Sequence, residues 1–90
     1  MYNLPLRKVK IYTNVLNQNQ TQALQGDFNF IQILNPAGSN LDITITDLDT
    51  TNFFNYSNIS PIFTLGRGSR RISIKNNSSA PIFVVWESVV

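Results

Sequence analysis

The residues best suited to chemistry in this 90-residue sequence form the run Gly66-Arg67-Gly68-Ser69-Arg70-Arg71. Glycines let a backbone approach a phosphate closely, and arginines offer bidentate hydrogen-bond donors. The run begins like a dinucleotide fingerprint, but Arg71 takes the place of the third glycine, and no P-loop ending follows. We predict that contact with a partner or nucleic acid involves Arg67, Arg70, Arg71 and Lys75. The alternative is a glycine turn that leads into a strand whose outer face is basic for solubility.

Asp47, Asp49 and Thr51 have the spacing of the first ligands in an EF-hand calcium loop. The rest of the loop does not follow, since position 6 is Asn52 instead of glycine and position 12 is Asn58 instead of glutamate. The two aspartates match the carboxylate pair of a glycoside hydrolase equally poorly. An Asx-type turn is therefore the expected structure of this segment.

Cysteine and histidine are both absent from the sequence. Their absence removes disulfides, thiol nucleophiles, Cys/His zinc sites, imidazole bases and Ser-His-Asp triads. We expect no enzymatic activity, no catalytic residues, no cofactor, no metal and no small-molecule substrate. Aromatic residues could stack on sugars, but they are spread over four segments, which is more typical of core and interface anchors: Tyr2, Tyr12, Tyr56 and Trp86.

The net charge of +2 conceals an uneven distribution of basic residues. All seven lie in residues 7–10 and 67–75, whereas residues 11–66 contain four aspartates and no basic residue. Charged residues make up only 13% of the chain, and Asn, Gln, Ser and Thr occupy 32 of its 90 positions. The two basic segments suit non-specific contact with a genome, membrane headgroups or an acidic protein.

The elements that position these residues are predicted to be strands, because β-branched and aromatic residues recur with period two and no window has a helical period. We expect strands at residues 7–16, 23–25, 28–34, 41–47, 62–65, 70–75 and 81–90. Residues 17–22 and 48–61 are expected to be irregular, and residues 76–80 to form a hairpin loop. Short connections favour antiparallel pairing of neighbouring strands. We therefore predict an all-β fold, a small, jelly-roll-like antiparallel β-sandwich of six to eight short strands, in one domain over residues 1–90.

Two of these strands alternate between apolar and polar residues, which is typical of strands with one buried face. Residues 7–16 place one row on the expected inner face: Val9, Ile11, Thr13 and Val15. Residues 41–47 place Leu41, Ile43 and Ile45 inward. Both strands are expected to be half-buried.

Two other strands are apolar on both faces, although only one face can lie against a sandwich core. In residues 28–34, one face carries Phe28, Phe30 and Leu34, and the other carries Ile31 and Ile33. In residues 82–86, one face carries Ile82, Val84 and Trp86, and the other carries Phe83 and Val85. Exposed apolar rows promote aggregation unless another subunit buries them. We predict a subunit interface at Phe83, Val85 and Phe28, with cover by residues 53–63 as the alternative.

Several segments in a fixed order carry a resemblance. A basic first strand is followed by residues 26–31 (Gly-Asp-Phe-Asn-Phe-Ile) and 41–45 (Leu-Asp-Ile-Thr-Ile), then by a glycine loop, residues 71–78 and a final strand over 80–86. This order resembles small all-β virion structural proteins of bacteriophages, of the minor capsid, vertex (penton) or decoration type. The resemblance implies a non-enzymatic capsid vertex or minor capsid component. Such a protein would form a pentamer or trimer, contact the major capsid protein, and reside in the virion after synthesis in the host cytoplasm.

Two other functions are compatible with the residues. One is a soluble binding module for carbohydrate or protein, with residues 17–22 and 48–60 as its binding edge. The other is a nucleic-acid-binding β-barrel whose basic contacts are Lys8, Lys10, Arg67, Arg70 and Arg71. Basic residues follow the apolar ones at the N-terminus, the reverse of a secretory signal, so we expect the chain to remain in the cytosol or be packaged from it.

Overall fold

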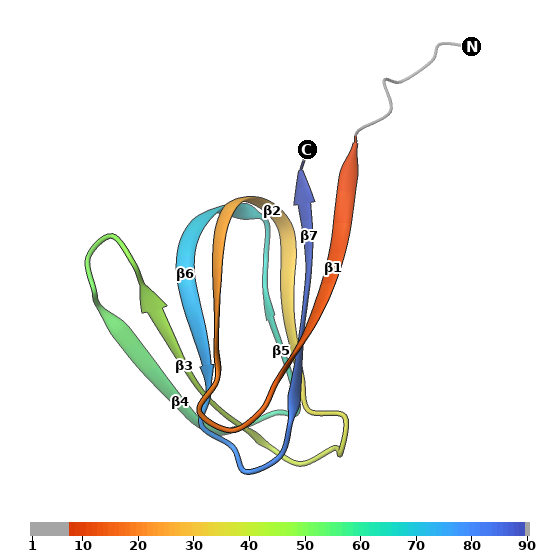
Figure 1. The fold of residues 1–90 in the computed structure, drawn as a ribbon, viewed down its shortest axis with the longest axis vertical. Coiled ribbons are helices and arrows are strands. Elements are labelled where there is room, and N and C mark those ends of the chain that lie inside the picture. The colour runs from red at the N-terminus through yellow and green to blue at the C-terminus, as the bar shows by residue number, and fades with distance from the viewer. Residues whose placement is uncertain (1–7, 90) are drawn as a thin grey trace.

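The computed structural model describes residues 8–89, which form seven strands and no helix. The strands are β1 (Val9–Leu16), β2 (Thr21–Leu34), β3 (Leu41–Asp47), β4 (Phe53–Ile59), β5 (Ile62–Leu65), β6 (Gly68–Asn76) and β7 (Ile82–Val89). They form one antiparallel sheet in the order β1-β7-β2-β6-β3-β4, and β5 pairs with β2 beside that path. The structure confirms the predicted all-β antiparallel fold. Because the sheet curls over on itself (Figure 1), it is compatible with a small sandwich or jelly roll.

Strand β2 is the longest element, with 14 residues, and it bends in the middle (Figure 1). Both β5 and β6 pair with the same edge of β2 and keep the same register along it. The pairing runs from Leu34 opposite Ile62 on β5 to Thr21 opposite Lys75 on β6. The expected break at Gly26 is not present. Gly26 has a φ of 138°, a conformation open to glycine, so the strand bends there without ending.

The bend of β2 divides the sheet into two layers. The first half of β2 pairs with β6, which continues to β3 and β4, while the second half lies between β7, which continues to β1, and β5. The core between the layers consists of ten buried apolar residues: Leu16, Leu24, Phe28, Ile31, Ile33, Leu41, Ile43, Ile74, Ile82 and Val84. The core therefore draws on both halves of β2 and on both layers.

A β-bulge in β2 decides which phenylalanine enters this core. The register with β7 shifts between Phe28 and Phe30, so an extra residue of β2 is accommodated there. The shift moves Phe28 to the side of Ile31 and Ile33, where it is only 2% exposed, whereas Phe30 stays half-buried on the opposite side. The expected common face of Phe28, Phe30 and Leu34 is therefore wrong. Phe28 is a core residue of the single chain, which corrects its assignment to a subunit interface.

Other elements differ from the prediction at the margins of the sheet. Strand β1 is exposed from Val9 to Val15, and not half-buried, because it lies at the edge with β7 as its one neighbour. The segment expected to be irregular contains β4, which forms the other edge. Residues 76–80 are not a hairpin, because β6 and β7 do not pair with each other but lie on either side of β2. The predicted bounds of 41–47 and 62–65 are confirmed.

Aromatic side chains close the flank where β4 and β5 approach. The rings of Phe54 and Tyr56 are 4.7 Å apart, and those of Tyr56 and Phe63 are 4.8 Å apart. Arg7 and Tyr2, which the sequence analysis placed among the basic and aromatic residues, lie outside the described residues. Within residues 8–89, no helix is long and apolar enough to cross a membrane.

Candidate functional site

The basic residues predicted to contact a partner do not all lie together. Arg67, Arg70 and Arg71 lie at the start of β6 beside the bend of β2, where Gly26 is opposite Arg70. Lys75 lies towards the other end of β6, about 13 Å from Arg71 at roughly 3.3 Å per residue of strand. The sequence-predicted group is therefore divided into an arginine cluster and a separate lysine.

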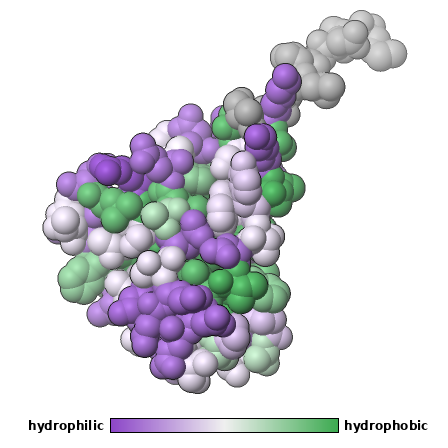
Figure 2. Space-filling view, viewed as in Figure 1, coloured by the Kyte–Doolittle hydropathy of each residue, from purple (hydrophilic) through white to green (hydrophobic). Residues whose placement is uncertain are grey.

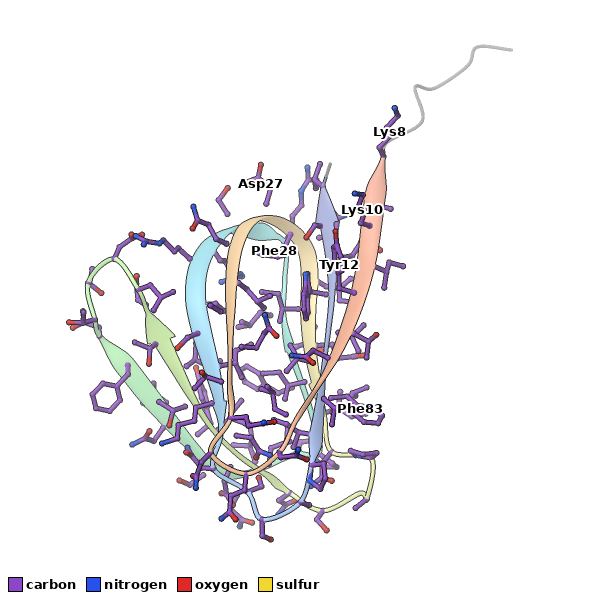
Figure 3. All side chains as sticks on the ribbon, in the orientation of Figure 1. Lys8, Lys10, Tyr12, Asp27, Phe28 and Phe83 are labelled. Atoms are coloured by element: carbon purple, nitrogen blue, oxygen red, sulfur yellow. The ribbon has the colours of Figure 1, made fainter. Side chains whose placement is uncertain are left out.

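Two lysines distant in sequence join the end of the molecule that carries the arginines. Lys10 is opposite Ser88 on β7, and Ser88 is opposite Phe28 on β2. Phe28 in turn is opposite Gly68 at the start of β6, so one row of residues leads from Lys10 to the arginine cluster. Figure 3 shows Lys8 and Lys10 at the upper end of β1, on the same end of the molecule as Asp27.

Two of the arginines are engaged by their own chain. The Arg70 Nη2 donates a hydrogen bond to the Gly66 carbonyl at 3.0 Å, so this side chain is folded back on the preceding loop. The Arg71 Nη1 is 2.8 Å from the Asp49 Oδ1 in an exposed ion pair. Arg67 is exposed. Of the three, Arg67 is therefore the side chain most available to a partner.

Two shallow depressions lie beside the arginine cluster. One of about 340 Å³ is lined by Asp27, Phe28, Arg67 and Ser69 among others, and a second of about 480 Å³ by Asp27, Asp49, Arg70 and Arg71 among others. The Ser69 hydroxyl donates a hydrogen bond to the Asp27 carboxylate. Each depression combines arginine with aspartate, so this end offers mixed charge and not the uniformly basic track that a phosphate backbone favours.

The acidic pair forms the turn predicted for it. The Asp49 amide donates a hydrogen bond to the Asp47 Oδ1 at 2.9 Å, which confirms the Asx-type turn. The Asp49 side chain points to Arg71 instead of sharing a centre with Asp47. Among residues 8–89, no three acidic side chains converge in the manner of a metal site.

A second candidate site is one face of the layer formed by β1, β7, the second half of β2 and β5. Register defines its rows: Val15, Phe83, Leu34 and Ile62 lie side by side across the four strands. In the next row Val85 lies among the polar residues Thr13, Gln32 and Thr64, and the rows beyond it contain Ile11, Phe30, Val9 and Val89. Its one charged residue is Glu87, which accepts a hydrogen bond from Asn29 at 2.6 Å. We call this surface the apolar outer face.

Exposure confirms that this face points away from the core. Ile11 is 64% exposed, Ile62 56% and Val15 47%, while Phe83 and Val85 are half-buried. Their neighbours Ile82 and Val84 are completely buried on the opposite side of β7. Figure 3 shows Phe83 projecting outward from β7, and Figure 2 shows hydrophobic residues along the flank where β1 and β7 lie.

Residues 53–63 do not cover this face. Strand β4 pairs with β3 in the other layer, and β5 extends the face by pairing with the edge of β2. The alternative of cover by residues 53–63 is therefore wrong. Phe83 and Val85 lie on the outer side of β7, and their contact with another subunit stays a prediction. The alternation of residues 9–15 assigned Ile11 and Val15 to a buried face, which is wrong because both lie on the exposed side of β1, and Ile62 was not predicted to join them.

Comparisons with known proteins show similarity of fold alone. No protein-family model matches the chain, and no curated protein matches its sequence. ToxT from Vibrio cholerae, in a structure with bound unsaturated fatty acid, superposes with a TM-score of 0.53 and 13% identity, over 97% of this chain and 32% of ToxT. The capsular polysaccharide assembling protein CapF from Staphylococcus aureus superposes with a TM-score of 0.55 and 9% identity, over 93% of this chain and 25% of CapF. The chain thus spans a third or less of these proteins.

Proposed function

We propose that this chain is a non-enzymatic structural subunit that assembles with copies of itself through the apolar outer face. The observation that carries the proposal is the row Val15, Phe83, Leu34 and Ile62, which crosses four strands without a polar residue. A sheet that faces water on one side normally carries polar residues there. A second subunit would bury this row, as an obligate interface does.

The face is large enough for its burial to change the stability of the chain. Four strands about 4.8 Å apart and seven residues of about 3.3 Å give a surface of roughly 400 Å², which includes the polar side chains of Thr13, Gln32 and Thr64. A patch of this size is as large as the largest one on an ordinary monomer, which is often functional. At roughly 25 cal/mol per Å², burial of even part of it contributes several kcal/mol. That gain is comparable to the whole stability of a small domain, so assembly and folding are expected to be linked.

The setting that we propose is a bacteriophage virion, where the chain would be a capsid vertex or minor capsid component in contact with the major capsid protein. This setting rests on the order of sequence segments that resembles such proteins. The many Asn, Gln, Ser and Thr side chains suit the wet, hydrogen-bonded margins of subunit contacts. Purified particles from a producing culture should contain the chain in a fixed ratio to the major capsid protein.

The first test is the native mass of the purified protein, measured by light scattering on a sizing column. We expect a trimer or pentamer for the wild type. The double variant Ile11→Glu/Val15→Glu should be a monomer, because it places two charges on the apolar outer face without entering the core. A stable wild-type monomer at about 100 μM would contradict the proposal and favour a binding module or a nucleic-acid-binding protein.

A matched control separates burial of this face from a general effect of added charge. Ala23 is exposed in the first half of β2, in the other layer. Ala23→Glu should therefore keep the wild-type mass. Circular dichroism spectra that coincide for all three proteins would show that the fold is retained. If the double variant also keeps the wild-type mass, the contact lies elsewhere.

A further inference from the structure

The sheet ends in two edge strands that differ in character. Strands β1 and β4 lie at opposite ends of the strand order, so each has one neighbour and one free edge in the described part of the chain. The four-residue β5 also pairs with one strand, β2, but it is too short to offer a comparable edge. In β4 the regular segment runs from Phe53 to Tyr56, before the register with β3 shifts near its end. This segment contains no charge and no proline, the usual means of protecting an edge from another strand.

Exposed apolar side chains accompany both edges. On β4, Phe53 is 66% exposed and Phe54 is 62% exposed, and they are the largest exposed side chains of their layer. On β1, Ile11 and Val15 are 64% and 47% exposed. Each edge therefore offers unpaired backbone groups together with apolar surface, which is the combination that a neighbouring strand can complete.

The charges at the two edges are opposite. Lys8 and Lys10 lie at the start of β1, whereas Asp47 and Asp49 lie in the turn that leads into β4. Asp49 is paired with Arg71, so Asp47 is the carboxylate of this turn that makes no ion pair among the described residues. Figure 1 shows that β1 begins at the upper end of one flank and that the turn between β3 and β4 lies towards the upper end of the opposite flank. A second copy placed beside the first in the same orientation brings the two lysines to the acidic turn.

We propose that copies of this chain join head to tail, with the β1 edge of one copy against the β4 edge of the next. This inference rests on the proposed self-assembly and names the part of the second copy that contacts the β1 side of the apolar outer face. Every copy carries one edge of each kind, so the contact repeats and closes into a ring when the rotation between copies allows it. A symmetric contact between two β1 edges would instead end at a dimer and would place Lys8 and Lys10 beside their own counterparts.

Mixing two blocked variants tests the head-to-tail arrangement. Ile11→Glu/Val15→Glu blocks the β1 edge and leaves β4 intact, while Phe53→Glu/Phe54→Glu blocks the β4 edge and leaves β1 intact. We expect each variant alone to be a monomer. An equimolar mixture should form a 1:1 pair and nothing larger, because one intact edge of each kind remains. Glutamate is used at both edges so that the blocked edges do not attract each other.

The outcomes separate this inference from the proposed function. A wild-type monomer would remove the proposed self-assembly and this inference with it. If the wild type assembles but the β4 variant keeps the wild-type mass, or if the mixture of two monomeric variants remains monomeric, the head-to-tail arrangement is wrong and self-assembly stands. Because Phe54 contacts Tyr56, the single variant Phe53→Glu provides a second β4 block that leaves the aromatic contact in place.

Discussion

Asn76 is a buried polar side chain that connects three segments of backbone. It is 0% exposed, and its Nδ2 donates hydrogen bonds to the carbonyls of Leu16 at 3.0 Å and Ala80 at 2.9 Å. Its Oδ1 accepts a hydrogen bond from the Ser78 amide at 2.8 Å. The side chain thereby ties the end of β1 to the connection between β6 and β7. The sequence marked this asparagine only as part of a polar loop, because nothing in the local pattern shows burial.

Replacement of Asn76 by alanine should therefore be costly. Asn76→Ala leaves three backbone groups without partners in a site closed to water, and we expect a loss of about 3 kcal/mol in the free energy of unfolding. Asn77→Ala is the control, because Asn77 is exposed and makes a hydrogen bond to the Thr44 hydroxyl at the surface. Urea denaturation should show a loss below about 1 kcal/mol for the control. Equal losses for both variants would show that Asn76 does not have this role.

Gly26 is the residue at which backbone conformation permits the bend of β2. Its φ of 138° is strained for any residue with a Cβ, although a Cβ would meet no atom within 4 Å. Gly26→Ala should therefore lose about 1–3 kcal/mol through backbone strain alone. Gly66→Ala is the control, since Gly66 has an ordinary φ and equally open space, and its stability should change by less than about 1 kcal/mol. Chemical denaturation of both variants measures the difference in their free energies of unfolding. Equal stabilities would contradict the claim that an alanine at position 26 strains the backbone.

At the scale of the elements, the sequence predicts strands well where one face is buried. Strands β3 and β5 have the predicted bounds because apolar residues alternate or end abruptly there. Strand β4 escaped prediction because an edge strand with both faces largely exposed has no alternation to reveal it. The prediction that a strand ends at Gly26 is wrong for a related reason. A glycine that bends a strand cannot be distinguished in sequence from a glycine that ends one.

The residues of the apolar outer face could be predicted from sequence only where inward and outward side chains alternate strictly along a strand. Phe83 and Val85 were placed correctly because β7 alternates without interruption from Ile82. Phe28 was misplaced because one extra residue at the bulge exchanges the two faces of β2. Ile62 joins the face only through its pairing with Leu34, a contact between distant residues that periodicity does not contain. The ion pair between Arg71 and Asp49 was hidden for the same reason.

At the scale of the whole molecule, the same apolar surface should link thermal stability to protein concentration. Assembly that buries the apolar outer face stabilises the folded chain by mass action, by up to about 2.7 kcal/mol for a hundredfold rise in concentration. For a domain of this size each kcal/mol shifts the Tm by about 4–8 °C. We therefore expect the Tm of the wild type to rise by roughly 10 °C between about 2 and 200 μM, measured by circular dichroism at fixed scan rate.

The Ile11→Glu/Val15→Glu variant should show one Tm at both concentrations, because it leaves the core intact and removes only the contact between copies. The Tm of Phe53→Glu at the two concentrations decides whether β4 belongs to that contact. In a head-to-tail interface, blocking either edge removes the dependence of the Tm on concentration. A wild-type Tm that stays constant while the native mass shows an oligomer would mean that the copies meet through surfaces too small to matter for folding. The exposed row across β1, β7, β2 and β5 would then have a partner other than this chain.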